Sequence, residues 1–137
     1  MNEINGILLV DKPKGITSQS LLTKIKKQLQ VKKIGHAGTL DPLATGLMVV
    51  LLGSATKLSD YLLNNEKEYQ CEILIGKSSN TEDITGSIVD SKEVKRITDV
   101  EKVLNSLIGT LKQVPPMYSS IHHNGIKLYE LARQGWK

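Results

Sequence analysis

The chain has 137 residues, 39% of them hydrophobic and 23% charged, with a formal net charge of +4 and a pI of about 9.1. This length and composition suit one globular domain with an aliphatic core, since Phe is absent and Trp occurs once. The longest apolar run is too short to cross a bilayer, and the first residues lack the pattern of a secretory leader. A single cysteine excludes an internal disulfide. We therefore expect a cytoplasmic protein.

The first half of the chain predicts two strands that alternate with helices. Residues 5–11 indicate a short buried strand, which runs into a tight turn with Pro and Gly at 12–15. Apolar side chains at helical spacing behind two hydroxyl residues predict a helix over 18–29. The continuous apolar run at 47–52 is typical of a strand covered on both faces, and a helix over 54–63 follows it.

The second half of the chain predicts shorter elements. Alternating apolar residues favour a strand over 67–76 and a hairpin partner over 87–90. Further expected elements are a helix that opens with a capping box at Thr98 and runs to 108, a strand over 110–114, a turn at 124–125 and a helix over 128–133. Together these elements indicate an α+β or mixed α/β domain.

A group of lysines marks the end of the first predicted helix. Five occur within ten residues, and no acidic residue interrupts them: Lys24, Lys26, Lys27, Lys32 and Lys33. One interpretation is a solvated helix face, which is what most charge clusters are. The other is a contact with the phosphate backbone of a nucleic acid, because such clusters release condensed counterions.

The glycine-rich stretch 35–47 concentrates polar chemistry around Asp41. Pro42 restricts Asp41 to an extended or turn conformation, so its carboxylate is expected on a rigid loop that leads into the apolar strand. An Asp in such a loop is often only a turn former. A carboxylate displayed in this way is also a candidate catalytic group.

Other catalytic and metal-binding patterns are missing from the sequence. The adjacent His122 and His123, together with His36 and Cys71, lack the spacing of a zinc site. The chain contains no phosphate-binding Gly-Lys-Ser/Thr loop, no dinucleotide fingerprint and no Gly-x-Ser-x-Gly elbow. We therefore expect no metal site.

The stretch 35–47, Gly-His-Ala-Gly-Thr-Leu-Asp-Pro-Leu-Ala-Thr-Gly-Leu, resembles the signature of the TruB-type tRNA pseudouridine synthases. Three flanking motifs fit the same family in the same order. They are Gly-Ile-Leu-Leu-Val-Asp-Lys-Pro-Lys-Gly at 6–15, Lys-Glu-Tyr at 67–69, and Pro-Pro-Met-Tyr-Ser at 115–119 with the helix at 128–133. The resemblance covers nearly the whole chain.

The resemblance implies an α+β fold with a mainly antiparallel sheet, and isomerisation of uridine 55 in the tRNA T-loop to pseudouridine. It makes Asp41 the catalytic nucleophile or base, and Tyr69 the residue that stacks on the flipped uracil. The family uses no metal and no cofactor. The expected partner is the tRNA T-arm. No sequence feature gives the oligomeric state, and we expect a monomer by default. The resemblance also implies that His36, Lys12 and Lys57 lie near the RNA and that Thr39 shapes the loop; the lysine cluster adds Lys32 and Lys33 as residues expected to contact RNA.

The sequence departs from the family pattern in its later part. A Lys-Gly-x-Tyr-Ile-Arg-type motif, whose arginine pairs with the catalytic aspartate, has no match, since Arg96 and Arg133 lie in other contexts. We therefore expect residues 1–137 to be the N-terminal portion of one catalytic domain, truncated before its C-terminal half and the RNA-binding region. The alternatives are an inactive RNA-binding remnant and a fragment that does not fold alone.

Overall fold

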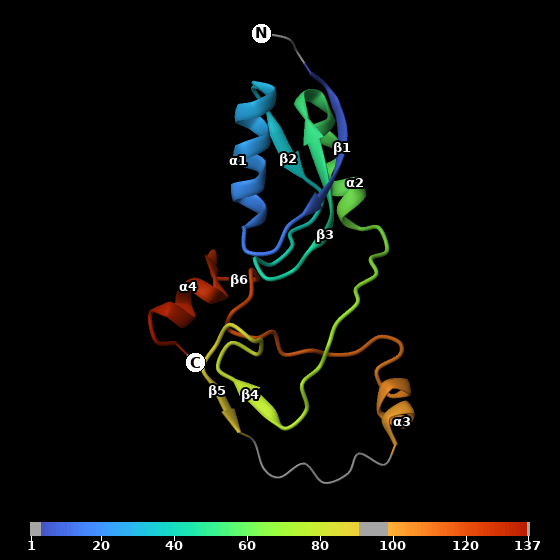
Figure 1. Ribbon diagram of the computed structural model, residues 1–137, viewed down its shortest axis with the longest axis vertical. Helices are drawn as coiled ribbons and strands as arrows, with labels where there is room; N and C mark the ends of the chain where they lie inside the picture. The colour runs from blue at the N-terminus through green and yellow to red at the C-terminus, as the bar shows by residue number, and fades with distance from the viewer. Residues whose placement is uncertain (1–3, 91–98, 137) are drawn as a thin grey trace. The chain divides into compact units, whose positions relative to one another are not determined.

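The computed structural model describes residues 4–90 and 99–136, and the chain divides into two compact units (Figure 1). The first unit is Met1–Tyr69 and the second is Gln70–Lys137. Every strand pair among the described residues is antiparallel. The expected α+β class, with helices and small antiparallel sheets, is therefore confirmed.

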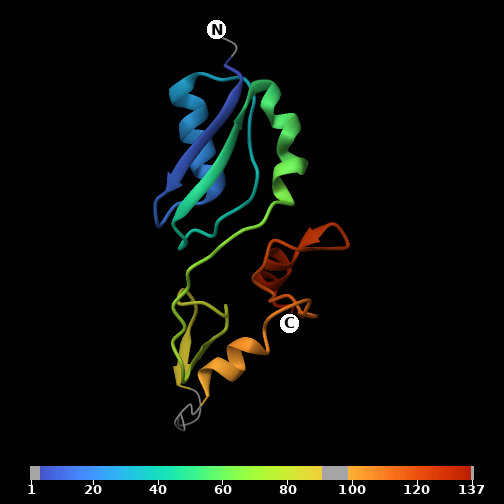
Figure 2. The same ribbon diagram turned by 90° about the vertical axis from the view of Figure 1, so that its right-hand side faces the viewer.

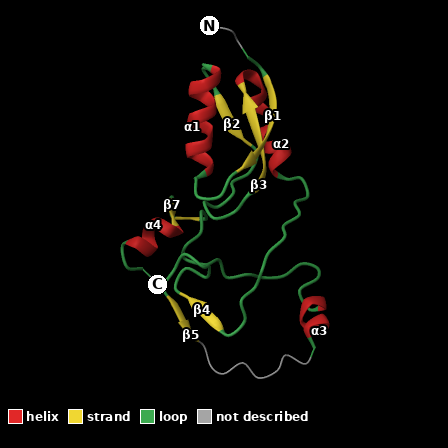
Figure 3. Cartoon of the chain, in the orientation of Figure 1, coloured by secondary structure: helices red, strands yellow, loops and turns green. Residues whose placement is uncertain are grey.

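The first unit is built on a three-stranded sheet in the order β1-β3-β2, shown in yellow in Figure 3. These strands are β1 (Gly6–Lys12), β2 (Ile34–His36) and β3 (Gly46–Leu52). The register pairs Gly6 with Leu52 and Lys12 with Gly46 along the whole length of β1. The central strand is β3, the apolar run that the sequence predicts to be buried.

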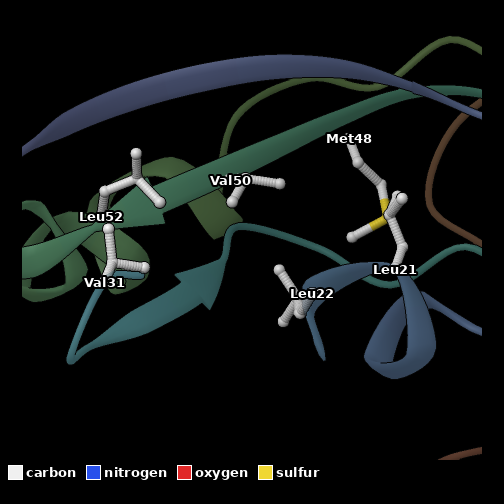
Figure 4. Close-up of a cluster of buried hydrophobic side chains, with 6 residues drawn as sticks. All are labelled: Leu21, Leu22, Val31, Met48, Val50 and Leu52. Atoms are coloured by element: carbon white, nitrogen blue, oxygen red, sulfur yellow. The ribbon is translucent and has the colours of Figure 1, made fainter. Parts of the chain in front are cut away.

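Helix α1 (Ser18–Leu29) covers one face of this sheet and has the bounds that the sequence predicts. Its N-cap is Thr17, whose side-chain oxygen accepts a hydrogen bond from the Ser20 amide at 3.0 Å. Alternate residues of β3 point at α1, as expected for the two-residue period of a strand. Figure 4 shows the resulting core, which consists of Leu21, Leu22, Val31, Met48, Val50 and Leu52.

The other face of the sheet carries a 3₁₀ helix, η1 (Gly53–Leu58), followed by α2 (Ser59–Leu63) (Figure 2). The sequence predicts one continuous helix here, and the chain instead forms two short ones. This face is only partly covered, because Leu51 is buried while Leu9 is 65% and Leu47 is 64% exposed. The prediction that residues 5–11 form a buried strand is therefore right for the side facing α1 and wrong for the other.

The second unit contains two hairpins and two short helices. Strand β4 (Lys77–Ser79) pairs with β5 (Ile88–Asp90), and β6 (His122–His123) pairs with β7 (Ile126–Lys127). The tight turn predicted at Asn124-Gly125 is confirmed, since both residues have positive φ as a two-residue hairpin turn requires. The helices are α3 (Val100–Asn105) and α4 (Leu128–Arg133), and α4 has its predicted bounds.

Three predictions for the second half of the chain are wrong. Residues 67–74 form no strand, and neither do residues 110–114. Helix α3 ends at Asn105, three residues earlier than expected, and its N-cap is Asp99; the predicted cap Thr98 lies outside the described residues. An alternating pattern becomes a strand only where a neighbouring strand pairs with it, and the sequence pattern does not show whether one is present. No helix in the described ranges 4–90 and 99–136 is long and apolar enough to span a membrane.

Candidate active site

The candidate site is the loop 37–45, which joins β2 to β3 in the first unit. At its start the Ala37 amide donates to the Val49 carbonyl at 2.9 Å, which extends the pairing with β3. The Ala44 amide donates to the Asp41 carbonyl at 3.1 Å and closes a turn with Pro42 at its second position. Asp41 therefore occupies the turn that the following proline predicts.

Two contacts pin this turn to the start of α1. The Gly15 amide donates to the Pro42 carbonyl at 2.7 Å. The buried Ser18 hydroxyl donates to the Leu40 carbonyl at 2.8 Å and accepts from the Leu40 amide at 3.0 Å. Because Leu40 also packs against the hydrophobic core, both the backbone and a side chain fix the residue before Asp41.

Lys12 lies beneath the same turn and is fully buried, with 0% of its surface exposed. Its ammonium donates to the carbonyls of Pro13 at 3.0 Å, Ile16 at 2.9 Å and Pro42 at 3.4 Å. A buried ammonium needs such acceptors, because its desolvation is otherwise costly. The sequence suggests that Lys12 contacts RNA, but in this conformation its side chain joins the β1–α1 turn to the Asp41 turn and offers no surface to a phosphate.

Asp41 itself is exposed, and so is Thr39. Among the described residues, no hydrogen-bond partner is found for the Asp41 carboxylate, while its backbone is held on both sides. A carboxylate fixed in this way is free to act on a bound substrate as a nucleophile or a base. The surrounding contacts fix the backbone of Asp41 and leave its side chain exposed.

His36 lies at the end of β2, next to the loop, and Lys57 lies in η1. His36 ends β2, is half-buried, and its carbonyl accepts a hydrogen bond from the Ser59 hydroxyl at 3.2 Å. Its ring Nδ1 is buried, and no partner for it is found within the described residues. Lys57 is exposed in η1, on the element that also supplies Thr56 as a packing neighbour of Gly35.

Tyr69 is the last residue of the first unit, and 67% of its surface is exposed. In the strand that the sequence predicts over 67–76, Tyr69, Ile73 and Ile75 would share one face. That strand does not form, and all three side chains are exposed. Two residues earlier, the Lys67 ammonium donates to the Leu63 carbonyl at 2.5 Å. The Lys67 chain lies beside the loop, since its Cε is 3.8 Å from the position that a Cβ on Gly38 would take.

Lys32 and Lys33 are exposed but lie at the opposite end of the sheet from Asp41. The Lys33 carbonyl accepts a hydrogen bond from the Gly53 amide at 2.9 Å, just beyond the end of β3. Since β3 runs seven residues from the loop to that point, the separation is about 20 Å. Nearness to His36 in the sequence therefore does not bring these lysines to the loop.

Gly15, Ser18 and Lys67 also support the site, although no pattern in the sequence was read as predicting this. Ser18 carried a signal, since two hydroxyl residues precede the apolar stripe and only one can be the N-cap. The cap is Thr17, so the second hydroxyl is free to bond the loop. No group of three or more His, Cys, Asp or Glu side chains arranged to hold a metal ion occurs in the part of the chain that the structure describes.

Comparison with known proteins identifies the family. A family model described as "TruB family pseudouridylate synthase (N terminal domain)" matches residues 26–137. The tRNA pseudouridine synthase B of Bacillus subtilis (strain 168) is 50% identical over 135 residues, which cover 96% of this chain and 44% of that protein. The enzyme of the same name from Blochmanniella pennsylvanica is 50% identical over 134 residues, which cover 97% and 52%.

Solved structures with similar parts include an H/ACA RNP bound to a substrate RNA containing 2′-deoxyuridine, with a TM-score of 0.42 and 45% identity over 42% of this chain and 18% of that chain. A Cbf5-Nop10-Gar1 complex has a TM-score of 0.40 and 40% identity, covering 42% and 17%. This chain thus spans about half the length of the curated relatives it matches. From its match over residues 26–137, the chain belongs to the TruB family of pseudouridylate synthases.

Proposed function

We propose that this chain carries the catalytic aspartate of a tRNA pseudouridine synthase that isomerises uridine 55 in the T-loop. The observation that carries the proposal is the exposed Asp41 carboxylate, fixed on a turn that Gly15, Ser18 and Lys12 anchor, in a chain of this family. Relatives that are 50% identical bear the name tRNA pseudouridine synthase B, which supports tRNA as the substrate.

The chemistry requires a group that engages the nucleoside and then leaves again. The bond from N1 of uracil to C1′ of ribose breaks, the base turns, and a bond from C5 to C1′ forms. The proton on C5 is lost and N1 gains one, so the atoms balance without a cofactor. A carboxylate serves as the nucleophile toward ribose, or as the base that acts on it, because it is also a good leaving group. The uridine must first leave its stack and enter the site.

We assign the remaining residues from the resemblance of the motifs that contain them. Tyr69, exposed at the end of the first unit, stacks on the flipped uracil and takes part in removing the C5 proton. His36, Thr39 and Lys57 contact the opened RNA loop. Lys12 acts through the Pro42 carbonyl as a positioning residue, in place of the RNA contact that the sequence suggests.

We further propose that residues 1–137 form the N-terminal portion of a catalytic domain whose activity needs the counterpart of the relatives' unmatched half. The Asp41 carboxylate lacks a cationic partner within the described residues, and an arginine from that half would orient it. The 44% of the Bacillus subtilis enzyme that this chain covers leaves more than half of that protein to supply one.

The test joins this chain to the unmatched part of the Bacillus subtilis enzyme and measures pseudouridine in an unmodified tRNA. We expect product at position 55, and a loss of at least about 10³-fold in kcat/KM for Asp41→Asn. The matched control is Asp11→Asn, an exposed aspartate on β1, which should stay within about twofold because surface changes have small effects. Product unaffected by Asp41→Asn would overturn the proposal, and binding without turnover by the unsubstituted chimaera would favour an RNA-binding remnant.

A further inference from the structure

Net positive charge is confined to one segment of the sequence. Residues 12–40 contain seven lysines and no Asp or Glu, whereas the rest of the chain holds 11 basic and 14 acidic side chains. The net charge of +4 therefore arises entirely within this segment, which comprises the β1–α1 turn, α1 and β2. Surfaces that serve only solubility usually intersperse both signs of charge.

Local structure does not account for these lysines. Lys24 and Lys27 lie three residues apart on α1, where like charges repel. Lys26 and Lys27 occupy the last turn, where cations are favoured by the helix dipole, but Lys32 and Lys33 follow the helix and gain nothing from it. All five are exposed, and no ion pair to them is found within residues 4–90 and 99–136.

Four of these lysines form what we call the lysine end of the first unit: Lys26, Lys27, Lys32 and Lys33. Helix α1 starts beside the Asp41 turn, where Ser18 bonds Leu40, and runs about 18 Å to the lysine end. The hydrogen bond between the Gly53 amide and the Lys33 carbonyl places the lysine end at the far end of β3 as well. Figures 1 and 2 both show α1 running along the sheet between these two ends.

We propose that the lysine end binds backbone phosphates of the RNA stem whose loop presents uridine to Asp41. The inference rests on the proposed function, and it adds a second contact about 20 Å from the reacting nucleotide. That distance corresponds to about seven base pairs at the ~2.8 Å rise per base pair of an A-form RNA stem. Lysines act as point charges toward phosphates, so the contact reads the presence of a stem and not its sequence.

The test uses the 137-residue chain and fluorescently labelled RNA hairpins with one loop sequence and two stem lengths. A stem of about four base pairs stops short of the lysine end, and one of about twelve reaches past it. We expect Lys32→Gln with Lys33→Gln to weaken binding of the long hairpin roughly tenfold. The slope of log K against log salt should fall in magnitude by about two, one for each lysine. Binding of the short hairpin should change less than twofold.

The matched control is Lys102→Gln with Lys112→Gln, which removes two exposed lysines outside the segment and changes the net charge equally. The charge-preserving pair Lys32→Arg with Lys33→Arg should retain binding of the long hairpin. An equal loss for both stem lengths, or an equal loss in the Lys102/Lys112 control, would overturn the inference. Pseudouridine formation by the chimaera is a separate readout, so its absence would count against the proposed function while leaving the stem-length result intact.

Discussion

The first and second units have nearly the same number of residues but bury very different amounts of apolar surface. In the first unit, α1 and β3 enclose a core that includes Leu22 at 3% and Val50 at 0% exposure. In the second unit, Leu131 is the one buried hydrophobic side chain among the described residues. Burial of apolar surface is the main driving force of folding. The core of the first unit is therefore enough to account for the stability of that unit, whereas the second unit buries too little apolar surface for the same explanation.

Helix α3 illustrates the difference. Apolar residues at i, i+3, i+4, i+7 and i+8 have the spacing of a core-facing helix, yet each is more than half exposed: Val100, Val103 and Leu104 on α3, and Leu107 and Ile108 just after its end. We call these five residues the α3 stripe. The same spacing in α1 is covered by the sheet. The comparison teaches that a sequence pattern specifies a face to bury but not what covers that face.

The largest expected effect on stability comes from truncating a buried leucine in the first unit, compared with an exposed leucine in the second. Leu22→Ala in α1 should lower the free energy of unfolding by about 2–5 kcal/mol, because it leaves a cavity under the sheet. Leu107→Ala removes the same atoms from a side chain that is 60% exposed and should cost about 0.5 kcal/mol or less. Urea unfolding of both variants measures this, and equal losses would show that the α3 stripe is covered in solution.

A smaller effect is expected beneath the Asp41 turn. Lys12→Met removes a donor from three carbonyls and should cost about 1–3 kcal/mol, because the Pro13 and Ile16 carbonyls lose this hydrogen bond, while the Pro42 carbonyl keeps the one from the Gly15 amide. The control Lys14→Met changes an exposed side chain of the same turn and should stay within about 0.5 kcal/mol. Thermal unfolding monitored by circular dichroism compares the two. If the variants have the same midpoint, the buried ammonium does not hold the turn.

A third prediction compares Ser18, which holds the Asp41 turn, with a neighbouring exposed residue of α1. Ser18→Ala removes both hydrogen bonds to Leu40 and should cost about 1–2 kcal/mol. In the chimaera it should also lower kcat more than it raises KM for tRNA, because Asp41 would be less well oriented. Gln19→Ala, at the next and exposed position of α1, is the matched control and should change neither quantity. A kcat unchanged by Ser18→Ala would separate loop anchoring from catalysis.

The smallest effect concerns local order in the second unit. Burial alone would raise the pKa of Asp83, but hydrogen bonds from Thr85 and Thr81 outweigh it and hold the pKa below its ordinary value of 3.8. The loop is therefore stabilised above about pH 3.8 and loses that contribution as the pH falls through the lowered pKa. Carboxyl NMR titration checks this, and Thr85→Ala should raise the pKa of Asp83. No change on that substitution would contradict the assigned cause.

The sequence predicts elements well where the signals are local. The capped stripe of α1, the Asn124-Gly125 turn and the helix α4 form as expected, because caps, turn residues and helical spacing act within a few positions. The strand expected over 67–76 fails because pairing depends on a distant segment. The position of Asp41 on a turn follows from Pro42, since the proline acts on its immediate neighbour.

The supporting contacts of the site could not be predicted in the same way. Burial of Lys12 is tolerated because the carbonyls of Pro13, Ile16 and Pro42 converge on it, and Pro42 is 30 residues away in the chain. The distance between Lys33 and Asp41 likewise depends on β3 running the full length of the sheet. The burial of Lys12 and the distance of Lys33 from Asp41 both depend on how distant segments of the chain pair, which the identity of each residue does not reveal.

The pair of hydrogen bonds between Ser18 and Leu40 has a consequence for how the loop opens. Because one hydroxyl in the first turn of α1 holds both the amide and the carbonyl of Leu40, the loop cannot detach while that turn keeps its shape. Amide hydrogen exchange at Leu40 should therefore follow the fraying of the first turn of α1 and not the faster exchange of a free surface loop. The first turn of α1 thus sets how often the Asp41 turn is released from the body of the first unit.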